Sequence, residues 1–137
     1  MTTHMTESLQ SHFLNLYSMA LSDSQIETLE LEKLYKIAQE KGVDKSQIDQ
    51  IILNPDKVRF NFPDTLEEKI IYLYDFAKII LADGRVDENE RRTLEIFCNR
   101  FGFEEANIPF IAEFLIDSAK EDLAEKEILQ IINENLN

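Results

Sequence analysis

The amino-acid sequence predicts an all-α fold of about seven helices in a single domain that spans residues 1–137. Glycine and proline, which interrupt helices, occur only three times each. Hydrophobic residues make up 44% of the chain and charged residues 30%, a composition typical of a folded protein rather than a disordered one. Apolar residues recur at three- and four-residue spacing through most of the sequence, as they do in helices packed on a core.

The first part of the chain predicts three helices. One covers about residues 7–21, and its apolar residues share one side. The next covers about residues 28–41 and ends at Gly42, because glycine accepts the left-handed backbone that often follows a helix. Asp44 is expected to open the third helix, since Gln47 follows it at the spacing of a capping box.

An irregular crossing is expected at residues 54–64, between two prolines. Phe60 and Phe62 should pack on the core from this segment. Asp64 is then expected to cap the following helix, with Glu67 as its capping-box partner.

The last four helices complete the fold. Gly102 is expected to end one of them, and Pro109 is tolerated in the first turn of the next. The first of these helices is predicted from just after residue 64 to about 82, and the second over about residues 88–101. The third is predicted to begin at about residue 107, and the fourth to cover about residues 123–135.

The sequence repeats itself at a constant offset of 60 residues. Residues 21–43 align without a gap on residues 81–103, with identities at Asp23/Asp83, Glu30/Glu90, Leu34/Leu94 and Gly42/Gly102. We therefore expect two similar three-helix halves, at about residues 7–55 and 67–115, related by a pseudo-twofold axis and closed by a seventh helix.

The chain is strongly acidic, with a net charge of −13, and residues 61–137 hold most of that charge. Such a surface repels nucleic-acid phosphates and anionic lipids, whereas a basic or amphipathic partner helix would suit it. The most apolar stretch, residues 70–82, is too short to cross a bilayer. It contains Asp75 three residues before Lys78, which predicts a surface ion pair. A buried acid there would instead indicate function, and the sequence leaves both open.

Cys98 is the only cysteine and cannot form an internal disulfide, which favours a cytoplasmic location. It shares a helical face with apolar neighbours and is expected in the core. The N-terminal residues have neither a basic region nor an apolar run, so no signal peptide is expected. The oligomeric state cannot be inferred.

The stretch LADGRVDENE, residues 81–90, resembles the second half of a calcium-binding loop. The first and third ligand positions of such a loop would fall on Ile79 and Leu81, whose side chains have no oxygen atom. An EF-hand is therefore excluded. Two interpretations remain: a helix corner, in which Gly84 has positive φ and Val86 packs beneath the turn, and a hard-cation site. That site would use Asp83, Asp87 and Glu90, with Asp23 and Glu30 as a second site, and would hold calcium, magnesium, manganese or zinc.

The stretch AKIILADGRVDENERRTLEIFCNRFGF resembles the signature of the tellurite-resistance protein B-like (TerB-like) family, with its Ala-Asp-Gly-x-Val-x-x-x-Glu core. The resemblance implies a bacterial protein of about seven helices in two similar halves, linked to tellurite and other stress responses. Acidic residues of the family have been proposed to bind metal, and the matching positions are Asp83 and Glu90, with Asp23 and Glu30 in the first half. Ser24 replaces the glycine there, which weakens the second site.

Three functions follow from these observations. The first is a non-enzymatic module that uses its acidic surface, or a groove between its halves, to hold a protein partner. The second is a sensor or buffer of divalent cations at the corner. The third, an enzyme, is not expected, because His4 and His12 lie at the N-terminus and no nucleophile–histidine pattern or phosphate loop is visible.

Overall fold

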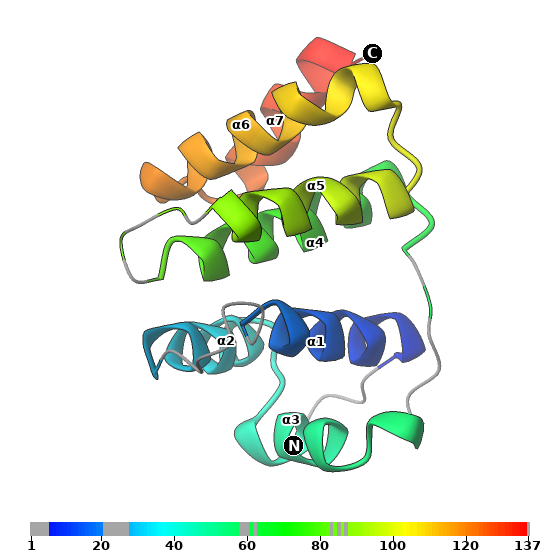
Figure 1. Ribbon diagram of the computed structural model, residues 1–137, viewed down its shortest axis with the longest axis vertical. Helices are drawn as coiled ribbons and strands as arrows, with labels where there is room; N and C mark the ends of the chain where they lie inside the picture. Colours follow the sequence, from blue (N-terminus) through cyan, green and yellow to red (C-terminus); the bar gives the residue numbers. More distant parts are fainter. Residues whose placement is uncertain are drawn as a thin grey trace.

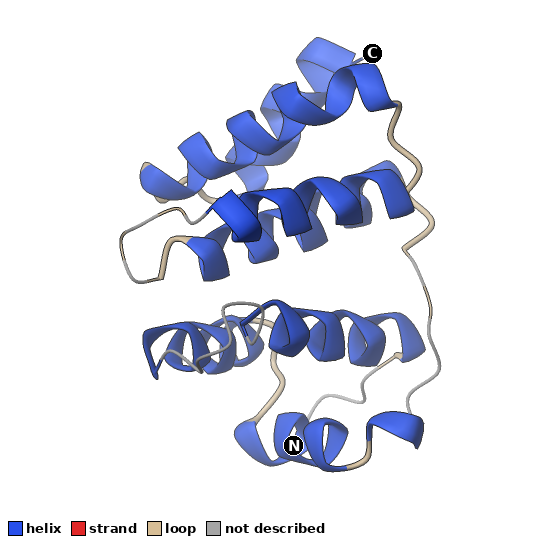
Figure 2. Ribbon diagram, in the orientation of Figure 1, coloured by secondary structure: helices blue, strands red, loops and turns tan. Residues whose placement is uncertain are grey.

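The fold is known from a computed structural model, which describes residues 6–20, 28–57, 61, 63–82, 84, 86 and 88–136. These residues form seven α-helices and two short 3-10 helices, and they include no strand (Figure 2). The all-α prediction is thus confirmed. The elements are α1 Glu7–Ala20, α2 Thr28–Glu40, α3 Lys45–Leu53, η1 Pro55–Lys57, α4 Leu66–Ile80, α5 Glu88–Arg100, η2 Glu105–Asn107, α6 Ile108–Lys120 and α7 Glu125–Leu136.

Helices α1, α2 and α3 pack on one another in the lower part of Figure 1, and α4 to α7 form the upper part. Helix α4 joins the two groups, because it contacts α1 and α2 below and α5, α6 and α7 above. Nine of its 15 residues are buried, as the apolar stretch predicted. Any polar side chain on α4 that faces the core therefore lies close to the middle of the molecule.

Local signals explain most helix ends. Asp44 caps α3, and a capping box with Gln47 is present as predicted. Gly42 and Gly102 follow α2 and α5 with φ values of +80° and +93°, in the left-handed region. Pro109 lies in the first turn of α6, where its missing N–H costs nothing.

Three expectations at helix ends and corners were wrong. Thr65, not Asp64, is the N-cap of α4, and its hydroxyl accepts a hydrogen bond from the backbone N–H of Glu68. Helix α7 begins at Glu125 rather than 123, because Leu123 belongs to the turn that closes α6. Val86 is exposed and does not pack beneath its corner. Phe60 and Phe62 lie outside the described residues.

The core contains Cys98, which is fully buried as predicted. Burial raises the pKa of its thiol to about 12, so the group stays protonated and unreactive at neutral pH. No helix among the described residues combines the length and the apolar character needed to cross a bilayer.

Candidate functional site

The two predicted corners place a buried glutamate at equivalent positions. Glu30 is the third residue of α2 and Glu90 the third residue of α5, and their exposed fractions are 0% and 1%. Both residues have interaction partners. Gly84 has φ +82°, as the sharp corner before α5 requires. Both glutamates are therefore buried in the protein and are not presented to solvent.

The other predicted cation ligands, Asp23, Asp83 and Asp87, lie outside the described residues. Within the part of the chain that is described, no three histidine, cysteine or acidic side chains come together in a way that could hold a metal ion. Glu30 and Glu90 alone do not make such a site, since hard cations take six or more oxygen ligands. The cation site thus stays a prediction from sequence spacing.

A buried polar cluster lies elsewhere, where α1, α2 and α4 meet. Nε2 of His12 lies 2.9 Å from Oδ2 of Asp75, and the exposed fractions of the two residues are 2% and 0%. Nζ of Lys41, just after α2, lies 3.2 Å from the same carboxylate oxygen and 3.2 Å from Oε1 of Glu125 at the start of α7. Of the two interpretations that the sequence left open for Asp75, the surface ion pair with Lys78 is excluded, because Asp75 is fully buried.

The surroundings of His12 fix its ring. The ring stacks on Tyr72, with centroids 3.9 Å apart and planes within 8°, and it also contacts Phe13 and Phe76. Its Nδ1 has no hydrogen-bond partner within the described chain. An ionised Asp75 needs a donor, so Nε2 carries the proton and Nδ1 is left as an acceptor, which costs less than a buried N–H without a partner.

The pKa values of the cluster favour one charge state. Burial lowers the pKa of His12 and outweighs the opposite influence of Asp75, so the ring is neutral. Burial alone would raise the pKa of Asp75, but the hydrogen bond from His12 and the charge of Lys41 leave it lowered. Burial alone would lower the pKa of Lys41, yet the charges of Asp75 and Glu125 leave it raised. A neutral histidine therefore lies beside an ion pair.

This cluster links α1, α4, α7 and the end of α2 through its hydrogen bond and ion pairs. We interpret it as a structural feature that stabilises the packing of these helices. A catalytic imidazole must reach its substrate, whereas His12 and Asp75 are sealed from solvent. The burial of His12 was not predicted from the sequence. The available signal was its place between Leu9, Phe13 and Leu16, on the apolar side of the first helix.

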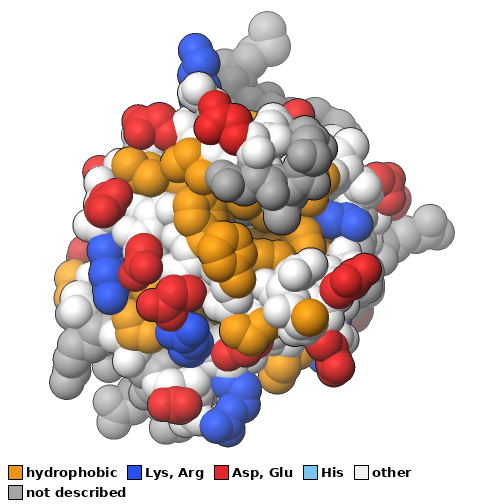
Figure 3. All heavy atoms as spheres, turned by 90° about the horizontal axis from the view of Figure 1, so that it is seen from above, with side chains coloured by type: hydrophobic (Ala, Val, Ile, Leu, Met, Phe, Trp, Pro, Cys, Tyr) orange, Lys and Arg blue, Asp and Glu red, His pale blue; other side chains and the backbone are white. Residues whose placement is uncertain are grey.

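A surface groove between α6 and α7 has the features of a binding site. Its volume is about 320 Å³, and its apolar lining consists mainly of Phe110, Phe114, Leu123 and Ile131. Phe110 is 60% exposed and stacks on Phe114. Seen from above, hydrophobic side chains gather in the middle of this end of the molecule, with acidic and some basic side chains around them (Figure 3).

The acidic rim of the groove comes from α6 and from Glu121, the residue that caps its C-terminal end. Glu113, Asp117 and Glu121 are spaced four residues apart, so they form one row along the helix, and all three are exposed. Oε2 of Glu113 lies 2.7 Å from Nη1 of Arg91 on α5. Asp117 and Glu121 form no ion pair with the described residues and remain available to a ligand.

Tyr74 anchors the end of this groove to the core. Its hydroxyl donates to the backbone carbonyl of Leu123 at 2.6 Å and also lies 3.2 Å from that of Ser118. Helix α4 thereby holds the turn between α6 and α7 in place, and the groove is a preformed feature of the fold.

Comparison of the chain with protein-family models, with curated proteins and with solved structures finds no match.

Proposed function

We propose that this chain is a non-enzymatic, cytoplasmic protein-interaction module that binds a basic amphipathic helix in the groove between α6 and α7. One observation carries this proposal. An aromatic row and an acidic row run side by side along α6, the first with Phe110 and Phe114 and the second with Glu113, Asp117 and Glu121. An apolar floor beside a row of carboxylates complements a helix that has one apolar face and one basic face.

The energetics of such a complex favour Phe110 as its central anchor. A largely exposed phenylalanine loses contact with water when a partner covers it, and full burial of such a side chain is worth about 1.5–3 kcal/mol. The carboxylates at the rim contribute mainly to the rate and the selectivity of association.

The proposal includes membership of the bacterial TerB-like family, with its link to stress responses. The family's two-half architecture fits the offset of 60 residues, and the glycine ends at Gly42 and Gly102 and the buried acids Glu30 and Glu90 support it. The pseudo-twofold relation between residues 7–55 and 67–115 remains part of this proposal. The single cysteine, buried and protonated, favours the cytoplasm.

The test is the binding of a fluorescent synthetic peptide, a leucine–lysine sequence with an amphipathic helical pattern, measured by anisotropy at physiological ionic strength. Phe110→Ser is expected to weaken binding by about tenfold or more, since a buried aromatic contact is lost. The double variant Asp117→Asn/Glu121→Gln should weaken it less and reduce its salt dependence.

The matched control is Ile96→Ser, because Ile96 is 46% exposed on α5 and does not line the groove. It removes an exposed apolar side chain of the same protein without changing the net charge. If Phe110→Ser and Ile96→Ser change the affinity for the peptide equally, the peptide is attracted only by the overall negative charge of the protein, and the proposal fails.

The second candidate function is the binding of a divalent cation at the corners, as sensor or buffer. The burial of Glu30 and Glu90 at equivalent positions favours it. A residue that only caps a helix can do so while exposed, so capping alone does not explain why both glutamates are buried. The remaining ligands would be Asp23, Asp83 and Asp87, with calcium, magnesium, manganese or zinc as the ion.

This alternative predicts a rise in melting temperature when one of these cations is added to chelator-treated protein. At one hundred times the dissociation constant the ion would stabilise the fold by about 2.7 kcal/mol. Glu90→Gln should abolish the shift, whereas Glu88→Gln, an exposed neighbour in the same first turn, should leave it intact. Identical melting curves with and without every cation would exclude the site.

A further inference from the structure

A second groove runs along the opposite side of the α6–α7 turn, between α2 and α4. It consists of two adjoining cavities of about 310 and 580 Å³, which share Lys33, Lys36, Lys78, Ala119 and Asp122 as lining residues. We call this feature the lysine groove. Cavities of this size accommodate small molecules.

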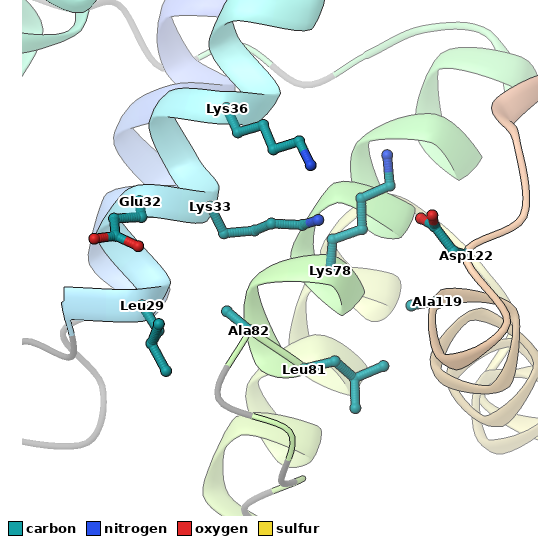
Figure 4. A pocket seen from close by; sticks show the side chains of 9 residues that line it. All are labelled: Leu29, Glu32, Lys33, Lys36, Lys78, Leu81, Ala82, Ala119 and Asp122. Carbon is teal, nitrogen blue, oxygen red and sulfur yellow. The ribbon is translucent and has the colours of Figure 1, made fainter.

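Three ammonium groups converge in the lysine groove. Lys33 and Lys36 are three residues apart on one face of α2, and both extend toward Lys78 of α4 (Figure 4). Nζ of Lys78 also lies 4.8 Å from the centre of the Tyr74 ring. Among the described residues, none of these three lysines forms an ion pair.

The lack of an ion pair at these three described lysines is informative because the chain has acids in excess. It contains 27 acidic and 14 basic residues, so a lysine that needs a partner can easily have one. The fold instead brings three lysines from two helices to the same space, where like charges repel one another. A bound anion would relieve that repulsion.

The acidic residues of the lysine groove do not cancel this charge. The carboxylate of Glu32 points away from the three ammonium groups in Figure 4. Glu125 is paired with Lys41, and Glu40 is exposed on the last turn of α2. Asp122 remains, on the side of the groove opposite α2 (Figure 4).

Asp122 is unusual in its backbone. Its φ of +55° lies in the left-handed region, and it occupies the helix-ending position that Gly42 and Gly102 occupy after α2 and α5. Glycine would adopt this conformation at lower cost, by about 1 kcal/mol. An aspartate kept there supplies a carboxylate at the edge of the lysine groove.

We propose that the lysine groove binds a small phosphate monoester that also carries hydroxyl groups. The phosphate would accept hydrogen bonds from Lys33, Lys36 and Lys78, whose compact charges and rotatable donors suit a tetrahedral dianion. The carboxylate of Asp122 would accept a hydrogen bond from a hydroxyl group of the same ligand. A small ligand fits here although nucleic acid does not, because the remaining surface of this highly acidic protein repels a phosphate polymer.

This inference can be tested independently of the proposed partner helix, because the two grooves share only Leu123 among their lining residues and each groove residue that is substituted belongs to one groove. The experiment is isothermal titration calorimetry with inorganic phosphate and with glycerol 3-phosphate, with sodium chloride holding the ionic strength constant. Both probes should bind, and glycerol 3-phosphate should bind more tightly. Lys33→Gln, Lys36→Gln and Lys78→Gln should each weaken both by about five- to tenfold.

Two further variants make the test decisive. Lys69→Gln removes the same charge from the first turn of α4, away from the lysine groove, and should change the affinity little. Asp122→Asn should tighten inorganic phosphate, because it removes a repelling charge, but should improve glycerol 3-phosphate less. The lysine substitutions act on side chains that are not in the buried core, and unchanged melting temperatures would confirm that the variants fold.

The proposal is overturned if neither probe binds, or if the groove variants behave like Lys69→Gln. It is also overturned if sulfate and acetate match glycerol 3-phosphate in affinity, since the lysine groove would then attract anions without recognising a phosphate ester. If Asp122→Asn improves both probes equally, the role assigned to the Asp122 carboxylate is wrong.

Discussion

Replacing Asp75 by alanine is expected to lower the free energy of unfolding by about 3–5 kcal/mol, a large part of the total stability of a domain this size. The carboxylate is fully buried and is the common partner of His12 and Lys41, which come from two other segments of the chain. Its loss leaves the N–H of His12 without an acceptor in the core. It also leaves the charge of Lys41 with Glu125 as its remaining partner.

Urea unfolding, followed by circular dichroism, measures this effect directly. Asp75→Asn is expected to cost less than Asp75→Ala, because an amide oxygen can still accept from His12 while the charge is lost. Glu95→Ala provides the matched control, since it breaks a surface pair with Arg91 and should change stability by at most about 1 kcal/mol. An Asp75→Ala protein as stable as the Glu95→Ala protein would show that the buried cluster does not hold the helices together.

The sequence predicted the helices well because their signals are local. The capping box of Asp44 with Gln47 and the glycines after α2 and α5 act within a few residues of the chain, and each lies where the pattern indicated. The wrong prediction of Asp64 instead of Thr65 as the cap of α4 also concerns a local signal. Both residues are good caps with a glutamate three positions later, and spacing alone cannot choose between them.

The buried cluster could not be predicted in this way. His12 and Asp75 are 63 residues apart, and nothing in their neighbours specifies that α1 and α4 lie side by side. A histidine near one end of the chain and an acid near a lysine both have ordinary surface interpretations. The pairing depends on helix packing, which requires the three-dimensional structure.

The lysine groove could not be predicted from the total charge, for a related reason. A net charge of −13 describes an average surface and does not show where basic side chains gather. Lys33 and Lys36 are on α2 and Lys78 is on α4, so their convergence becomes visible only when the two helices are placed side by side. The row of acids on α6, by contrast, has a spacing of four residues and could have been recognised in the sequence.

Acidification is expected to destabilise the fold through His12, at pH values well above those at which carboxylates titrate. Burial lowers the pKa of His12 in the folded state below its ordinary value of 6.5, which applies to the unfolded chain. The unfolded state therefore binds the proton more readily. The stabilising contribution of the neutral ring is complete above about pH 6.5 and is lost as the pH falls toward the folded pKa. The limiting slope for one proton is about 1.4 kcal/mol per pH unit.

The groups that face His12 determine the size of this effect. Burial opposes protonation of the ring most strongly and Lys41 also opposes it, while Asp75 and Glu125 favour it. Protonation would also place an N–H at Nδ1, which has no acceptor within the described chain. The lowered pKa of Asp75 adds a separate loss of stability below about pH 3.8, where the unfolded carboxyl group binds a proton first.

His12→Gln separates the imidazole from the rest of the cluster. A glutamine amide can extend about as far as Nε2 and donate to Asp75, but it does not titrate. Urea unfolding between about pH 7.5 and 5 should therefore show a shallower fall in stability for this variant than for the unaltered protein. His4→Gln removes the other imidazole of the chain and isolates its contribution. If the pH slopes of the unaltered protein and of His12→Gln are the same, His12 is not held neutral in the fold, and the charge state assigned to the buried cluster is wrong.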